Sequence, residues 1–127
     1  MGSSQNRSVR ASRWREYAKE GIGKASVLPE GPKRWSPSKP AETAIDRARA
    51  LVSAIKSDEL PLPMTSAGPD GVFCLEWREP DRKLVFYIFD NGLIEFYVNT
   101  PHVSQAEGEI GDRIEQANEV VQTYLRR

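Results

Sequence analysis

The chain has 127 residues, 39% of them hydrophobic and 28% charged, and its 18 basic residues balance 18 acidic ones. These values are ordinary for one globular domain with a core of its own. The single cysteine excludes an internal disulfide and a cysteine-based metal cluster, and no apolar run reaches the ~18 residues of a membrane span, so we expect a cytoplasmic protein.

Residues 1–39 are predicted to form a basic N-terminal arm and linker. The first forty residues hold nine basic and three acidic side chains, a net charge of +6 that the rest of the chain cancels. A short helix is expected over residues 8–20, with Trp14 and Tyr17 on one face. Glycine and proline predict a loop over residues 21–39, which Trp35 would pin to the body.

Residues 40–127 are predicted to form a single α+β domain. Its first element is a helix that starts at Pro40, where the missing N–H costs nothing, and ends near residue 57. Apolar residues recur there at helical steps and form one face: Ala44, Ile45, Ala48, Leu51, Val52 and Ile55. The run Leu-Pro-Leu-Pro that follows then forces an extended segment.

Alternating apolar residues predict an antiparallel β-meander of three to four strands. The expected strands cover residues 72–78, 84–89 and 93–98, with residues 64–67 as a short edge strand. Asn91-Gly92 suits a two-residue hairpin, because both central residues need a positive φ. A last helix is expected over residues 109–125. The prediction is therefore an α+β fold in which two amphipathic helices cover one face of the meander, preceded by the basic helix or arm.

The segment from Pro40 to Tyr97 resembles a group of small uncharacterised bacterial proteins. These have an Ala/Leu-rich helix, an LPxP element, a DGxxxLEW element and a short hairpin. Here Asp70-Gly71, Leu75-Glu76-Trp77 and Asn91-Gly92 carry the resemblance. A Trp-Asp-Gly element expected before the helix is missing, with only Trp35 nearby. The resemblance implies the same fold and a bacterial or phage origin, and it brings no activity and no catalytic residues.

No residue set has the spacing of a catalytic, metal or cofactor site. His102 is the only histidine, and by itself it makes neither a zinc site nor a triad. Cys74 lies between apolar strand residues, which favours an inert thiol. Glu76 and Glu95 lie in strands whose solvated face carries such residues routinely, and Glu76 is expected to pair with Arg78 or Lys83. We therefore expect a protein that is not an enzyme.

Two features favour binding. The basic arm offers charge and aromatic rings, and the sheet face away from the helices is expected to expose an apolar strip of Val85, Tyr87, Phe89, Leu93 and Tyr97. The candidate partner-binding residues are Arg10, Arg13, Trp14, Tyr17, Trp35, Tyr87 and Tyr97. The first hypothesis is a bacterial or phage interaction protein, antitoxin-like, inhibitor-like or an accessory subunit, that binds a protein partner or a second copy. The alternative is a nucleic-acid-binding protein that uses the arm.

Overall fold

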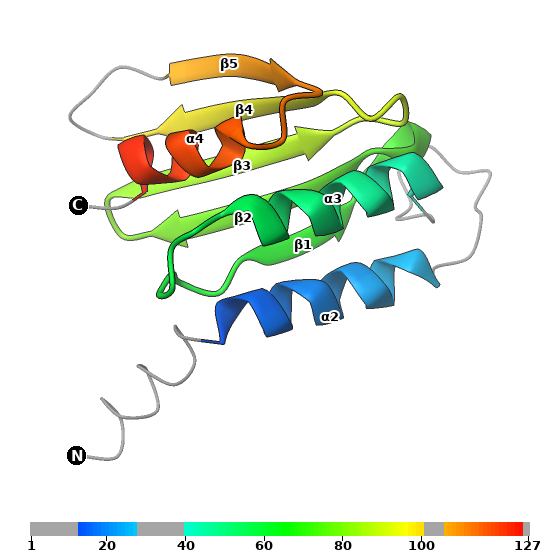
Figure 1. Ribbon diagram of the computed structural model, residues 1–127, viewed down its shortest axis with the longest axis horizontal. Coiled ribbons are helices and arrows are strands. Elements are labelled where there is room, and N and C mark those ends of the chain that lie inside the picture. Colours follow the sequence, from blue (N-terminus) through cyan, green and yellow to red (C-terminus); the bar gives the residue numbers. More distant parts are fainter. Residues whose placement is uncertain (1–12, 28–39, 101–105, 126–127) are drawn as a thin grey trace.

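Five strands form one antiparallel sheet in which each strand pairs with the next along the chain (Figure 1). The computed structural model describes residues 13–27, 40–100 and 106–125. The strands are β1 (Met64–Ala67), β2 (Phe73–Glu79), β3 (Arg82–Ile88), β4 (Ile94–Asn99) and β5 (Ala106–Gly111). The helices are α2 (Trp14–Ser26), α3 (Glu42–Ala54) and α4 (Gln116–Tyr124), and a short 3₁₀ turn, η1 (Pro69–Gly71), joins β1 to β2.

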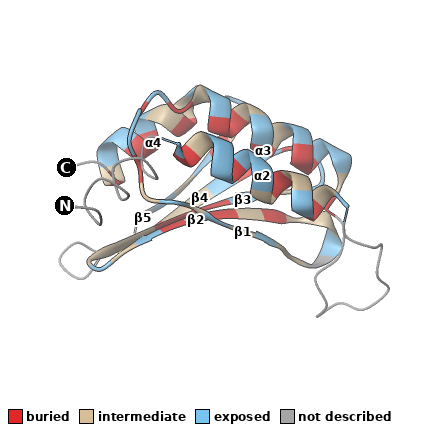
Figure 2. Ribbon diagram, turned by 90° about the horizontal axis from the view of Figure 1, so that it is seen from below, coloured by how far each residue is buried: buried red, intermediate tan, exposed pale blue. Residues whose placement is uncertain are grey.

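All three helices pack on the same face of the sheet (Figure 2). None of the described helices covers the other face, which we call the uncovered face. The α+β class and the antiparallel meander are thus confirmed. The predicted number of strands was too low, because the described part of the chain holds five strands; its three helices correspond to the two amphipathic helices and the N-terminal helix of the prediction. Strand β5 was not predicted, and α2 was predicted without its place in the core. Both come from segments with a weak apolar pattern.

Strand β5 replaces the first turns of the predicted last helix. Ile110 and Ile114 have helical spacing, but residues 106–111 pair with β4 instead, and α4 begins only at Gln116. Gly108 makes this pairing compatible with the core, since a Cβ at its position would lie 2.7 Å from the ring of Phe96. Long-range pairing therefore overrides the local helical pattern.

Helix α2 starts later and ends later than the sequence predicted. It continues through Gly21 and Gly23, which were expected in a loop. Its buried stripe consists of Trp14, Ala18, Ile22 and Ala25, and these residues belong to the same core as α3 and the sheet. The helix lies within the residues assigned to the arm, so the arm's described part contributes directly to the core.

Trp14 is the largest side chain that α2 contributes. Its ring is fully buried and meets Trp77 of β2 edge-to-face, with ring centroids 5.8 Å apart. Its Nε1 donates a hydrogen bond to the carbonyl oxygen of Ser57 at 3.0 Å. The guanidinium of Arg15, stacked over the Trp14 ring, donates to the carbonyls of Ile55 and Ser57. Helix α2 is thereby tied to the segment that follows α3.

We predict that Trp14→Ala lowers the free energy of unfolding by about 3–5 kcal/mol, because it empties a fully buried aromatic site. Tyr17→Ala is the control on the same helix. Tyr17 is 38% exposed, so its removal should change stability by about 0.5 kcal/mol or less. Urea denaturation followed by circular dichroism measures both. Equal, small effects would show that α2 does not belong to the cooperative core.

The two glycines of α2 should respond oppositely to alanine. A Cβ at Gly21 would lie 2.5 Å from Oγ1 of Thr65 in β1, whereas a Cβ at Gly23 meets nothing within 4 Å. Gly23→Ala should therefore raise the free energy of unfolding by about 0.5–1 kcal/mol, the usual gain in a helix interior. Gly21→Ala should forfeit this gain or destabilise the fold. A gain from both substitutions, measured by thermal denaturation, would contradict the close packing of α2 on β1.

Candidate functional site

The uncovered face of the sheet carries two rows of side chains that run across all five strands. Its composition follows from the register, since alternate residues of each strand point away from the helices. One row consists of Ser66, Cys74, Tyr87, Glu95 and Glu109, and the next of Met64, Glu76, Val85, Tyr97 and Glu107. The two tyrosines occupy the middle of this face, and three glutamates lie beside them towards β5.

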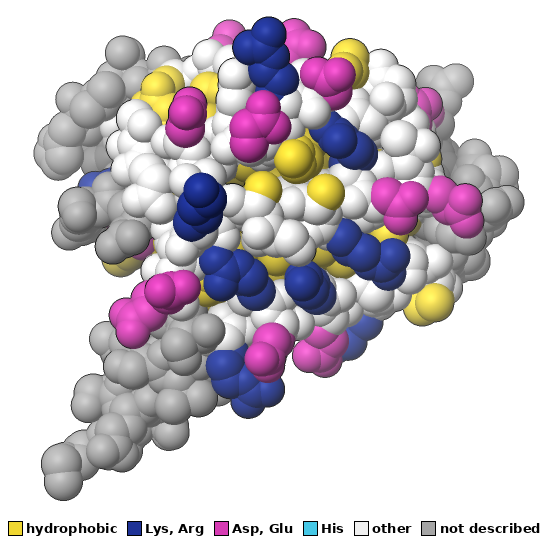
Figure 3. All heavy atoms as spheres, in the orientation of Figure 1, with side chains coloured by type: hydrophobic (Ala, Val, Ile, Leu, Met, Phe, Trp, Pro, Cys, Tyr) yellow, Lys and Arg dark blue, Asp and Glu magenta, His cyan; other side chains and the backbone are white. Residues whose placement is uncertain are grey.

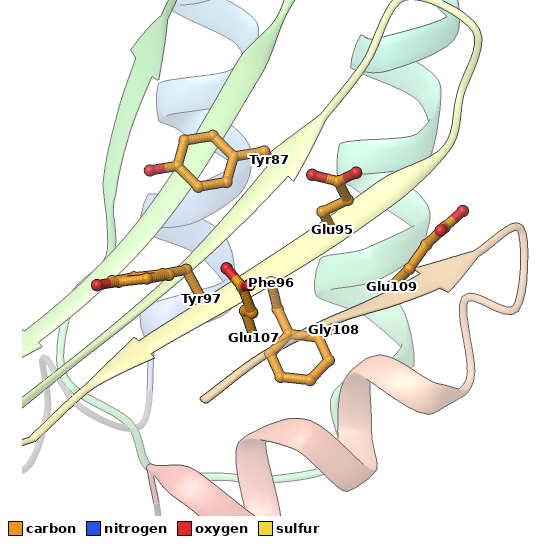
Figure 4. A pocket seen from close by; sticks show the side chains of 7 residues that line it. All are labelled: Tyr87, Glu95, Phe96, Tyr97, Glu107, Gly108 and Glu109. Carbon is orange, nitrogen blue, oxygen red and sulfur yellow. The ribbon is translucent and has the colours of Figure 1, made fainter. Parts of the chain in front are cut away.

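We call Tyr87, Tyr97, Glu95, Glu107 and Glu109 the Tyr/Glu patch. Together with Phe96 and Gly108, these residues line an open depression of about 440 Å³ on β3, β4 and β5 (Figure 4). Tyr87 and the three glutamates are exposed, and Tyr97 is half-buried. The patch therefore presents two aromatic rings beside a row of carboxylates to solvent.

The observed side chains of this face differ from the exposed apolar strip that the sequence predicted. Val85 is only 4% exposed, and Phe89 is half-buried, while Tyr87 and Leu93 are each 38% exposed. Glu109 was expected to begin the last helix and Glu107 to lie just before it, so their place in a strand beside Tyr97 and Glu95 was missed. A strand pattern was present, because the two glutamates alternate with Gly108 and Ile110, but two glycines and two glutamates have poor strand propensity.

The carboxylates of the patch are close in register and lack neutralising neighbours. Glu95 lies directly opposite Glu109, and like charges in this arrangement repel. Over residues 13–27, 40–100 and 106–125, no lysine or arginine forms an ion pair with Glu95, Glu107 or Glu109. This end of the uncovered face is therefore negatively charged and would be stabilised by a cation.

Glu76 behaves differently from the glutamates of the patch. Its carboxylate forms an ion pair with Arg78 at 3.2 Å, one of the two pairings expected from the sequence, and its side chain is only 19% exposed. Glu76 and Glu95 lie on β2 and β4, on the same face but with β3 between them. No group of three or more histidine, cysteine or acidic side chains in the described ranges is placed to hold a metal ion.

Cys74 faces Tyr87 across the β2–β3 pair. Burial raises the pKa of the Cys74 thiol, a hydrogen bond with Ser66 opposes this rise, and the charge of Glu76 adds to it. Burial also raises the pKa of Tyr87, with smaller contributions from Cys74, Glu76 and Tyr97. Both shifts favour the neutral forms of the two groups.

The other predicted partner-binding residues lie elsewhere. Trp14 is buried in the core, which removes its ring from the surface. Tyr17 is exposed on α2, with the guanidinium of Arg13 5.6 Å from its ring centroid, and Arg13 pairs with Glu16 at 2.7 Å. The candidates Arg10 and Trp35, and also His102, lie outside the described residues. Of the seven candidates, the structure brings together Tyr87 and Tyr97 on the sheet, and Arg13 and Tyr17 on α2.

The helix side of the molecule carries mixed charge. Lysine and arginine side chains gather over α2 and α3, with carboxylates among them (Figure 3). None of the described helices is both long and apolar enough to cross a membrane. Comparison with protein-family models, curated proteins and solved structures found no match to the chain.

We predict that Cys74 reacts with iodoacetamide at pH 8.5 more slowly than in the unfolded chain, because its raised pKa leaves less thiolate. Since the folded pKa exceeds the ordinary value of 9.0, the protonated thiol favours the fold at lower pH, and this contribution disappears as the pH rises through the folded pKa. Glu76→Gln should speed the reaction and Ser66→Ala should slow it. Mass spectrometry gives the rates; the opposite order would refute these causes.

Proposed function

We propose that the chain is a non-enzymatic interaction protein, of the antitoxin-like, inhibitor-like or accessory-subunit type, that binds a protein partner on the uncovered face of its sheet. The observation that carries the proposal is the Tyr/Glu patch, in which the exposed Tyr87 and the half-buried Tyr97 adjoin carboxylates that no described lysine or arginine neutralises. Tyrosine is enriched among residues that dominate binding energy, because a large rigid ring combines apolar area with a hydroxyl.

The extent of the face also supports a protein partner. A stable protein interface buries ~800 Å² on each side, which requires an extended surface, and the two rows of side chains on the uncovered face span all five strands. The depression at the patch is open to solvent, whereas small-molecule sites bury most of the ligand surface. The thiol of Cys74 and the phenol of Tyr87, both with raised pKa values, fit a binding surface better than a catalytic one.

The structure favours the nucleic-acid alternative less. The carboxylates of the patch would repel phosphates, so nucleic acid would need the basic side of α2. There Trp14 is buried and cannot stack on a base, and Arg15 is engaged by main-chain carbonyls. Lys24 lies 3.6 Å from Glu20, an exposed pair that solvent screens. Lys19 and Lys24 are the exposed lysines of the described part of α2, so this part of the helix offers few phosphate contacts.

We predict that Tyr87→Ala and Tyr97→Ala each weaken partner binding by about tenfold or more, the effect of losing a hot-spot tyrosine. Tyr17→Ala is the matched control, because Tyr17 is as exposed as Tyr87 but lies on α2. The test is affinity capture from a lysate of the source organism, quantified by mass spectrometry over a salt series with nuclease-treated replicates.

Support for the proposal is a protein that the unmodified chain and Tyr17→Ala retain and that both patch variants lose. Retention that disappears with nuclease or depends only on Tyr17 would favour nucleic acid or the arm instead. Retention that no variant changes would remove the sheet face as the binding surface.

A further inference from the structure

The Tyr/Glu patch ends at an open edge of the sheet. β5 pairs with β4 on one side, and no described strand or helix continues the sheet beyond it (Figure 1). The opposite edge differs, because β1 has four residues and α2 packs closely against it at Thr65. An edge strand presents unpaired N–H and C=O groups that an added strand can complete. β5, with six residues, offers the longer of the two edges.

A second copy of this chain is a poor occupant of the β5 edge. In antiparallel self-pairing centred on Gly108, Glu107 of one copy would face Glu109 of the other on the same side of the sheet, where like charges repel. Shifting the register by one residue would turn the glutamates of one copy to the side of Ile110, which is buried. The same carboxylates attract a strand that carries lysine or arginine.

The two faces of the sheet at the β5 edge favour different side chains in an added strand. On the uncovered face, a basic side chain beside Glu107 or Glu109 can reach Glu95 in the next strand. On the helix face, the ring of Phe96 leans over Gly108 and contacts Tyr124 of α4, with ring centroids 6.0 Å apart. Phe96, Ala106 and Tyr124 are only partly buried, so this side offers apolar surface.

We propose that the edge of β5 accepts an extended segment of a protein partner in which basic and apolar residues alternate. The added strand would place its basic side chains on the Tyr/Glu patch and its apolar side chains beside Phe96 and Tyr124. This inference rests on the proposed function and names the chemistry and geometry of the partner. Main-chain hydrogen bonds would hold the added strand against β5, and the alternation of basic and apolar side chains would make binding selective.

The probe is a capped six-residue peptide of alternating lysine and valine, equal in length to β5. Three control peptides are the block sequence of the same composition, the alternating peptide with N-methylated backbone amides, and an alternating glutamate–valine peptide. Fluorescence anisotropy on the full chain measures affinity, and amide hydrogen exchange by NMR reports on β5. The lysine–valine peptide should bind at least about tenfold more tightly than each control and should slow exchange of β5 amides.

The charge-reversed variant Glu107→Lys with Glu109→Lys should lose the lysine–valine peptide and gain the glutamate–valine peptide. The control is Glu115→Lys with Glu119→Lys, which changes net charge equally at exposed positions near and within α4 and should leave binding unchanged. Circular dichroism verifies that both double variants fold. The reversal of preference cannot arise from misfolding, since a misfolded edge would bind neither peptide.

Equal binding of the block or N-methylated peptide would overturn strand addition. Slow exchange of β5 amides without peptide would mean that the chain's own N-terminal segment or a second copy already covers the edge. Sedimentation velocity would distinguish these two cases. Either result would overturn the proposal that a partner strand binds there. If no peptide binds while Tyr87→Ala and Tyr97→Ala still abolish capture of a natural partner, this inference fails and the proposed function stands.

Discussion

The aromatic contacts between α2 and the sheet hold the described part of this protein together. Trp77 of β2 lies between Trp14 of α2 and Phe86 of β3, with centroid distances of 5.8 and 6.0 Å and near-perpendicular rings. Such pairs contribute ~0.5–1.5 kcal/mol each beyond their buried area. Nε1 of Trp77 is buried and finds no acceptor among the described residues, so packing alone holds this ring. The orientation of α2 on the sheet follows from this stack.

This one-sided packing leaves one face of the sheet for the partner that we propose. Because α2, α3 and α4 all cover the same face, the apolar faces of the helices are buried in the core. The proposed binding surface is therefore the face that carries Tyr87, Tyr97 and the three glutamates of the patch. Trp14 illustrates the consequence. The sequence predicted it as a partner-binding residue, whereas in the fold its buried ring helps to hold α2 on the sheet.

Some basic residues of the chain are also engaged within the fold. Arg15 donates to the carbonyls of Ile55 and Ser57. Arg47 of α3 donates to the carbonyl of Gly92 at 3.3 Å and to that of Asp112 at 2.7 Å, so it joins the β3–β4 hairpin to the loop before α4. These arginines connect segments far apart in the sequence. A count of basic residues therefore overstates the charge that a phosphate backbone would meet.

The amino-acid sequence by itself determined the elements with strong local patterns. The helical spacing of Leu51 and Ile55 identified α3, and alternation identified β2, β3 and β4. Asn91-Gly92 correctly indicated a turn between β3 and β4, but the expected two-residue hairpin was wrong. Only Gly92 of the pair has a positive φ, and the turn is closed by hydrogen bonds from Gly92 N–H to the Phe89 carbonyl and from Phe89 N–H to the Leu93 carbonyl. It also placed Tyr87 and Tyr97 on the face away from the helices, because side chains in a strand alternate.

Only the tertiary structure decided the rest, since it depends on contacts between distant residues. The small residues Ala18 and Gly21 give α2 a weak hydrophobic pattern, yet they allow its close approach to β1. Glu107 and Gly108 are poor strand formers, and pairing with β4 makes them part of the sheet. That pairing brings Glu109 beside Glu95 and creates the Tyr/Glu patch, because register is a non-local property that local propensity cannot encode.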